Sequence, residues 1–306
     1  MSTQGRPVEF FDRSRAEVQV EPIYGEKWLR WAYENPLGRL TTRALVSRAV
    51  FSRWYGRRMS APASRHRIAP FLETYQLNPA EFQKNPEDFT SFNDFFTRKL
   101  KSETRPVDPD PQRLTFPADG RHLAIPNLAT TNTLYVKNQR LSLRNLLPSA
   151  VDFTPYKSGA ALLSRLCPID YHRLHFPFAG TPKNAHSIDG PLFSVNPIAL
   201  RHQITYLLRN KKVIIPFDTS LTPHPLLLVP VGATNVGSIQ LTYQPNAPVA
   251  KGDEIGCFAF GGSSIITLFP KDTIRFDEDL LTQSAQSRET YAKFGTSFAT
   301  ILPCPW

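Results

Sequence analysis

The high proline content constrains the fold of this 306-residue chain more than any other feature, since the chain holds 28 prolines and only 15 glycines. Proline lacks a backbone donor, so it interrupts helices and the middle of sheets. Here the prolines separate short apolar runs, a pattern that favours many strands and turns over long helices. From Leu114 onward these runs occupy residues 123–125, 133–136, 212–215, 226–231, 236–241, 256–260 and 265–269. We therefore predict a β-rich domain in this part of the chain.

The segment that precedes this domain differs in composition, and its pattern predicts helices. Between Lys27 and Arg67 it holds ten basic residues and a single acid, Glu34, so it carries +9 of the net charge of +10. Apolar residues between Leu40 and Trp54 recur at spacings that share one helix face. The prediction is an α+β fold. It has a basic, helical N-terminal region over residues 1–105 and a mainly antiparallel, β-rich domain over residues 106–306.

The basic segment allows three interpretations. It can be a solvated helical cap whose arginine stems pack on apolar surface. It can bind nucleic acid, although no recognisable nucleic-acid module follows it. It can also bind an anionic membrane surface, because it holds three of the four tryptophans, Trp28, Trp31 and Trp54. Taken alone, the segment does not decide between these interpretations.

The chain has no obvious membrane span, export signal or metal motif. No apolar stretch approaches the ~20 residues that a membrane-spanning helix needs. Residues 1–21 mix acids with bases and lack the apolar core of a signal peptide. Cys167, Cys257 and Cys304 form no C-x-x-C pair, so neither a zinc site nor a disulfide framework is indicated. We predict a protein made and kept in the cytoplasm, without a metal.

The tetrapeptide Gly261-Gly262-Ser263-Ser264 lies between two strand-like runs. Such a sequence is usually a flexible loop, and alone it is weak evidence for catalysis. A serine hydroxyl can nevertheless attack the preceding carbonyl when glycine lets the backbone reach a strained geometry. The resulting ester eliminates to dehydroalanine, which hydrolyses to a pyruvoyl group and ammonia. Ser263 is therefore a candidate for this self-cleavage.

Self-cleavage needs a base and an oriented carboxylate, and the sequence offers candidates for both. Asp119 lies in an Asp-Gly sequence that is also typical of an ordinary turn. His172 and His175 lie in one short motif and would point to opposite faces if that motif is extended. One of them could face Ser263, while the other serves a different step or only packs.

Seven segments, in this order, resemble the phosphatidylserine decarboxylase proenzymes, and the resemblance runs through most of the chain. The segments are FNDFFTRKLK (92–101, followed by Arg105 and Pro106), PADG (117–120), DYHRLHFP (170–177), LFSVN (192–196), VGATNVGSI (231–239), KGDEIG (251–256) and GGSS (261–264). The chain departs from the family in Ser264, where threonine is usual, in residues 210–212 and in Asn138. Ser264 is thus a formal rival nucleophile, but alignment of the following residues favours Ser263.

The resemblance implies a role for each candidate. Asp119, His175 and Ser263 would form the relay that cleaves the chain between Gly262 and Ser263, leaving a β chain (1–262) and an α chain (263–306). The pyruvoyl group from Ser263 would form a Schiff base with the amine of phosphatidylserine and accept electrons as CO2 leaves, giving phosphatidylethanolamine. His172 would serve the decarboxylation step.

The implied substrate also bears on the basic segment. A lipid substrate favours docking on the cytoplasmic face of the cell membrane, as a peripheral enzyme that binds anionic phospholipid and no nucleic acid. The sequence leaves a homodimer open. One alternative is a pyruvoyl-dependent decarboxylase of a soluble amino acid such as tryptophan, and another is a membrane-binding module without catalysis.

Overall fold

The fold is built on one large sheet, seen in a computed structural model that describes residues 7–23, 25–42, 49–130, 146–148, 151–203, 205–233, 239–259 and 263–303. The strand order is β2-β1-β15-β4-β5-β13-β10-β9-β7, and β8 also pairs with β9. Its strands are β1 (Glu9–Asp12), β2 (Glu17–Val20), β4 (Gly120–Ile125), β5 (Ala160–Leu166), β7 (Thr181–Pro182), β8 (His186–Ile188), β9 (Lys212–Asp218), β10 (Leu226–Val231), β13 (Ser263–Phe269) and β15 (Glu289–Ala292).

Two smaller sheets flank the large one. The first has the order β11-β12-β6, and the second has the order β14-β16-β3. Their strands are β3 (Arg113–Thr115), β6 (Arg173–His175), β11 (Ile239–Leu241), β12 (Glu254–Phe258), β14 (Ile274–Phe276) and β16 (Ser297–Ile301). Among the described strands, every pairing is antiparallel except that of β1 with β15. The predicted α+β fold with a mainly antiparallel sheet is confirmed.

The central strands of the large sheet are buried on both faces, which explains their nearly continuous apolar sequences. Every residue of β4, β5, β10 and β13 is buried. Ile266 and Leu268 of β13 point into the first core cluster, on the face where side chains of helices also pack. Ile265 and Phe269 point into a second core cluster, on the other face. Because successive side chains alternate, neighbouring residues of β13 belong to different layers of the core.

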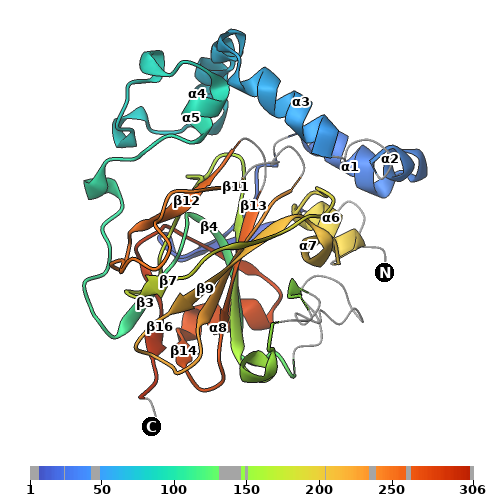
Figure 1. Ribbon diagram of the computed structural model, residues 1–306. Helices are drawn as coiled ribbons and strands as arrows, with labels where there is room; N and C mark the ends of the chain where they lie inside the picture. The colour runs from blue at the N-terminus through green and yellow to red at the C-terminus, as the bar shows by residue number, and fades with distance from the viewer. Residues whose placement is uncertain are drawn as a thin grey trace.

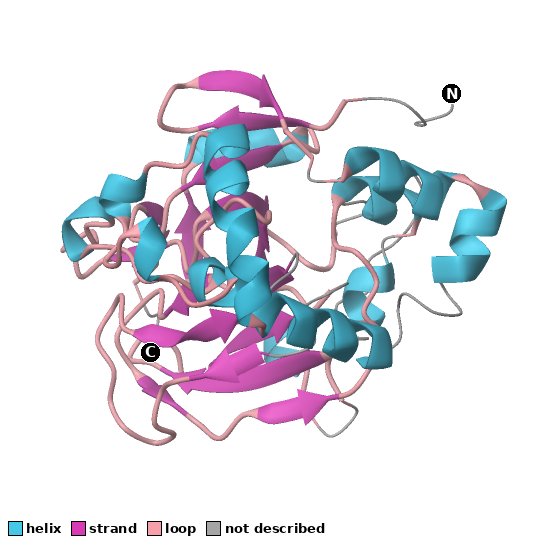
Figure 2. Ribbon diagram, turned by 90° about the horizontal axis from the view of Figure 1, so that it is seen from above, coloured by secondary structure: helices cyan, strands magenta, loops and turns pink. Residues whose placement is uncertain are grey.

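Helices lie across one end of the sheet and along its faces (Figures 1 and 2). They are α1 (Glu26–Glu34), α2 (Pro36–Thr41), α3 (Ala49–Ser60), α4 (Ile68–Tyr75), α5 (Phe92–Phe96), α6 (Pro197–His202), α7 (Thr205–Arg209) and α8 (Glu278–Ala285). Short 3-10 turns are η2 (Pro62–Arg67), η3 (Pro79–Glu81), η4 (Pro86–Asp88), η5 (Ser102–Thr104) and η7 (Thr154–Tyr156). The helical character predicted for the N-terminal region is present in α1 to α5, and none of the described helices is long and apolar enough to cross a membrane.

A cluster of phenylalanines attaches the N-terminal helices to the rest of the molecule. Phe92, Phe95 and Phe96 of α5 are almost fully buried and pack against α4 and the loop that bears Tyr171. Ser91 caps the start of α5, since its hydroxyl accepts a hydrogen bond from the Asp94 amide at 3.1 Å. This short helix therefore presents its aromatic face to the domain core.

The N-terminal region also contributes two strands that the sequence interpretation did not include. Strand β1 adds to the edge of the large sheet beside β15, and β2 folds back on β1. Arg13 follows β1 and forms ion pairs with Asp277 at 2.8 Å and with Asp279 at 2.7 Å. Strands β13 and β15, which begin at or after Ser263, thus lie between strands from earlier in the chain.

Candidate active site

Ser263 is the first residue of β13 and is completely buried. It pairs with Leu166 of β5. Its hydroxyl has no hydrogen-bond partner among the described residues. A buried hydroxyl without a partner calls for an explanation, and a chemical role is one such explanation. Gly261 and Gly262, which precede it, lie outside the described residues.

Ser264, the rival nucleophile, points the other way. It pairs with Arg165 of β5 and Val231 of β10, and Val231 belongs to the first core cluster. Ser263 shares its face with Leu166, which belongs to the second cluster together with residues of β6 and β12. Ser263 and Ser264 therefore face different layers of the core, and the layer that Ser263 faces contains Leu174 of the histidine motif.

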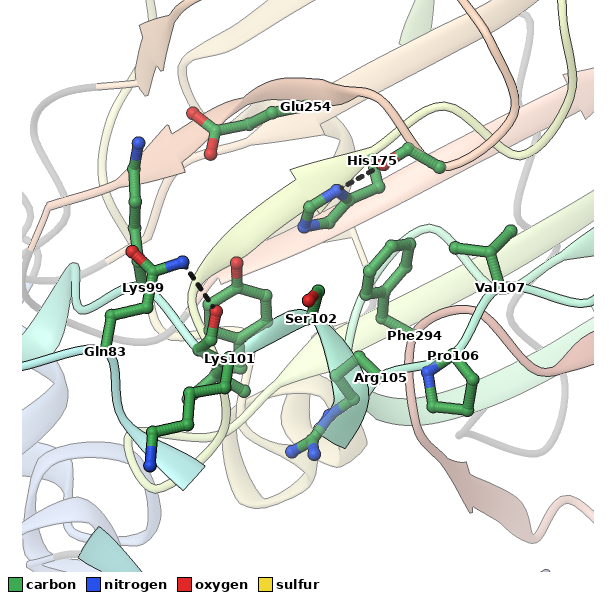
Figure 3. A pocket seen from close by; sticks show the side chains of 13 residues that line it. Gln83, Lys99, Lys101, Ser102, Arg105, Pro106, Val107, His175, Glu254 and Phe294 are labelled. Atoms are coloured by element: carbon green, nitrogen blue, oxygen red, sulfur yellow. Dashed lines mark hydrogen bonds between the residues drawn. The ribbon is translucent and has the colours of Figure 1, made fainter. Parts of the chain in front are cut away.

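His175 ends β6 and is held in a defined orientation. Its Nδ1 lies 2.8 Å from the carbonyl oxygen of Gly252, and its ring stacks on Phe294 with centroids 3.7 Å apart (Figure 3). A carbonyl only accepts, so Nδ1 carries the proton and Nε2 holds the lone pair in the neutral ring. Burial lowers the pKa of His175 to about 4. His175 is therefore neutral at physiological pH and can act as a base through Nε2.

Asp119 lies between β3 and β4 and is 1% exposed. Arg105 donates to both of its oxygens, at 2.6 to 3.0 Å, and the amide of Phe294 donates to it at 2.8 Å. Gly120 follows because strand β5 approaches closely, and a Cβ there would lie 2.6 Å from the Arg165 carbonyl oxygen. Burial disfavours the charge of Arg105, but the nearby carboxylates of Asp119 and Glu81 more than offset this effect and raise the pKa of Arg105. The pair is a fixed, buried ion pair.

The structure brings Asp119 and His175 together through Phe294 rather than by direct contact. The amide of Phe294 binds Asp119, while its ring stacks on His175. Within the described residues, no hydrogen bond joins Ser263 to Asp119, His172 or His175. The sequence indicated no role for Phe294, because its place depends on a contact between distant segments. Arg105 follows the first of the resembling segments, but the sequence indicated no role for it.

His172 is fully buried beside α5. Its Nδ1 lies 2.9 Å from the carbonyl oxygen of Asp170, and its ring packs on Phe96 with centroids 3.9 Å apart. Its own carbonyl accepts a hydrogen bond from the amide of Phe258 at 3.0 Å. Phe258 lies five residues before Ser263. His172 is thus anchored to the strand that leads toward the candidate nucleophile.

A cavity of about 410 Å³ lies beside His175 (Figure 3). Exposed cationic side chains, Lys99 and Lys101, stand along it, while Glu254 lies near His175 and is held by Arg173 at 2.7 Å. The remaining lining residues are Gln83, Leu100, Ser102, Arg105, Pro106, Val107, Tyr171, Gly252 and Phe294. A cavity with this lining can hold a polar, anionic group next to an imidazole. The described residues include no group of three or more His, Cys, Asp or Glu side chains that could hold a metal ion.

Comparison with known proteins identifies the class. Residues 92–299 match the family model described as phosphatidylserine decarboxylase. A phosphatidylserine decarboxylase proenzyme of Chlamydia pneumoniae is 40% identical over 289 residues, which cover 94% of this chain and 96% of the relative. The proenzyme of Clostridium botulinum (strain Alaska E43 / Type E3) is 38% identical over 295 residues, covering 96% and 99%. The chain is therefore a carboxy-lyase. It belongs to the phosphatidylserine decarboxylase family.

Proposed function

We propose that this protein is a self-processing phosphatidylserine decarboxylase that makes phosphatidylethanolamine. The observation that carries the proposal is the buried Ser263 hydroxyl, which begins a central strand and has no hydrogen-bond partner among the described residues. The chain would cleave itself between Gly262 and Ser263, giving a β chain of residues 1–262 and an α chain of residues 263–306. Ser263 would become a pyruvoyl group.

In self-cleavage, Ser263 loses its hydroxyl proton to Nε2 of a histidine as its oxygen attacks the carbonyl carbon of Gly262. The Gly262–Ser263 amide becomes an ester, and the serine nitrogen leaves the carbonyl as an amine. Removal of the Ser263 α-proton then expels the Gly262 carboxylate, and the dehydroalanine hydrolyses with loss of ammonia. We assign His175 as the base of the first step, because its Nε2 holds the lone pair and Phe294 joins its ring to the carboxylate of Asp119. Asp119 would stabilise the imidazolium that forms, through its nearby negative charge.

The surroundings of Ser263 fit a pyruvoyl group. The residue is fully buried between β5 and β10, and a small, neutral ketone needs no charge partner there. Once the substrate amine is bound to it, the group supplies an electron sink for the loss of CO2. We propose that His172 serves this step by orienting the carboxylate or returning a proton to the α-carbon.

The two chains would remain together after cleavage. Strand β13 of the α chain lies between β5 and β10, and β15 lies between β1 and β4, all four of which belong to the β chain. The buried ion pair of Arg165 with Glu289, 2.5 Å apart, also joins the two parts. Separation would require the large sheet to unfold, so the product of cleavage is a single two-chain enzyme.

We propose that the N-terminal helices bind the cytoplasmic face of the cell membrane. Their exposed side chains combine large apolar groups with positive charge, including Arg57 and Arg58 on α3. The exposed large apolar residues there are Trp28, Trp31, Leu37, Leu40 and Trp54. Aromatic and basic groups together suit an interface rich in anionic lipid. Lys99 and Lys101, beside the cavity, would bind the phosphate of the lipid head group.

Matched serine variants test this proposal. The Ser263→Ala chain should remain whole and form no phosphatidylethanolamine from phosphatidylserine vesicles. The Ser264→Ala chain, altered on the opposite face of the same strand, should cleave and retain activity. Turnover of free tryptophan or another soluble amino acid, without turnover of the lipid, would instead support the alternative decarboxylase. Vesicle binding without cleavage in the wild type would support a non-catalytic module.

A further inference from the structure

The segment from Leu166 to His172 joins β5 to β6. It contacts the chain at Ser263, the candidate nucleophile, and at Phe258, five residues before it. Leu166 pairs with Ser263 at one end. At the other end, the carbonyl of His172 accepts the amide of Phe258 at 3.0 Å. The shape of residues 166–172 therefore sets the spacing between Ser263 and Phe258, the last residue of β12.

Asp170 fixes the shape of this segment through its carboxylate and its amide. The carboxylate accepts from Nη1 of Arg121, at 2.8 and 3.0 Å, and from the amide of Cys167 at 2.6 Å. The Asp170 amide donates in turn to the Cys167 carbonyl at 2.9 Å. Arg121 is fully buried and also forms an ion pair with Glu21 at 3.2 Å. These contacts close a tight turn and tie it to β4.

The carbonyl of Asp170 orients His172. It accepts from Nδ1 of His172 at 2.9 Å and from Nη2 of Arg98 at 3.3 Å. Arg98 also donates to the carbonyl of Ile169 at 3.2 Å. Its guanidinium lies over the rings of Phe82 and Phe95, with distances of 5.1 and 4.9 Å to the ring centroids. The carbonyl is therefore held from the helical side by the buried guanidinium of Arg98.

We propose that Asp170 is a positioning residue for both reactions of this enzyme, with Arg98 holding its carbonyl in place. The carboxylate would set the register of Ser263 for self-cleavage, and the carbonyl would set the tautomer and ring orientation of His172 for decarboxylation. With Nδ1 donating to the carbonyl, Nε2 carries the lone pair whenever the ring is neutral. The roles of Ser263 and His172 in this inference rest on the proposed function.

The first test measures both reactions in Asp170→Asn and in Arg98→Met, with Asp189→Asn as the matched surface control. Asp189 is 94% exposed and lies outside the site. We expect Asp170→Asn to slow both self-cleavage and kcat by about 100-fold, the cost of misplacing a reacting group by ~1 Å, with KM within about threefold of the wild-type value. Arg98→Met should lower kcat more than the rate of cleavage, and Arg98→Lys should recover part of that loss.

A second test does not depend on activity and uses the uncleaved Ser263→Ala chain. Nitrogen-15 spectra of its histidines, assigned with His172→Gln, should give Nδ1 of His172 a protonated signal and Nε2 an unprotonated one. Arg98→Met or Asp170→Asn should mix the two tautomers, whereas Asp189→Asn should not. Unchanged rates and an unchanged tautomer in folded variants would overturn the inference. Wild-type protein that neither cleaves nor turns over lipid would refute the proposed function instead, and leave the tautomer result to stand by itself.

Discussion

The clearest quantitative prediction concerns Asp119→Asn, which keeps the shape of the side chain and removes its charge. The remaining oxygen can still accept from the Phe294 amide, but Arg105 loses a buried partner that it contacts at 2.6 Å. Removing one member of a buried ion pair costs about 3–5 kcal/mol. Glu81 still contacts Arg105 at 3.0 Å, so we expect the lower end, about 3 kcal/mol. At about 2–4 °C per kcal/mol, Tm should fall by roughly 6–12 °C.

The same substitution should slow self-cleavage. The negative charge of Asp119 raises the pKa of His175, so its loss should slow a step that creates imidazolium. Stability is measured by denaturant unfolding on the Ser263→Ala background, where each chain stays whole. Cleavage is measured by a time course of intact mass from newly made protein, with Asp189→Asn as the control. Wild-type stability and a wild-type cleavage rate would refute the reasoning.

Three further predictions concern other parts of the molecule. His175→Gln should give uncleaved protein, and the wild-type cleavage rate should stay level from pH 8 down to pH 6 and fall as the pH approaches about 4, where His175 gains a proton; a fall centred near pH 6.5 would contradict this. Burial lowers the pKa of His122 to about 3, so this histidine binds a proton more readily in the unfolded chain than in the folded one. The free energy of unfolding should therefore decrease as the pH falls below about 6.5. This decrease should be less steep in His122→Phe. Trp54→Ala should weaken binding to anionic vesicles, and added salt should weaken it further; equal binding to neutral vesicles would exclude the electrostatic part of the docking proposal.

Local pattern was enough to predict the fold class and to single out candidate site residues, because both depend on short-range features. Apolar runs between prolines become strands such as β10 and β13, and the basic segment contains helices α1 to α3. The turn that bears Asp119 and the motif that bears His172 and His175 were also visible as short patterns. These features need no knowledge of which distant segments meet.

The parts that the sequence did not indicate depend on long-range contacts. Strand β1 has only four residues, and its place in the sheet comes from pairing with β15, almost 280 residues later. Phe294 joins Asp119 to His175 only because the chain returns to the site near its end. Arg98 is a charged residue inside a phenylalanine cluster, a position that hydrophobic patterning assigns to surface.

The most direct test of the account is the intact mass of active, wild-type protein, measured after denaturation. We expect two masses that divide the chain after Gly262, with the smaller fragment carrying a pyruvoyl group, reducible by borohydride, in place of the amino group of Ser263. A single mass for the whole 306-residue chain, in protein that decarboxylates phosphatidylserine, would contradict the central claim.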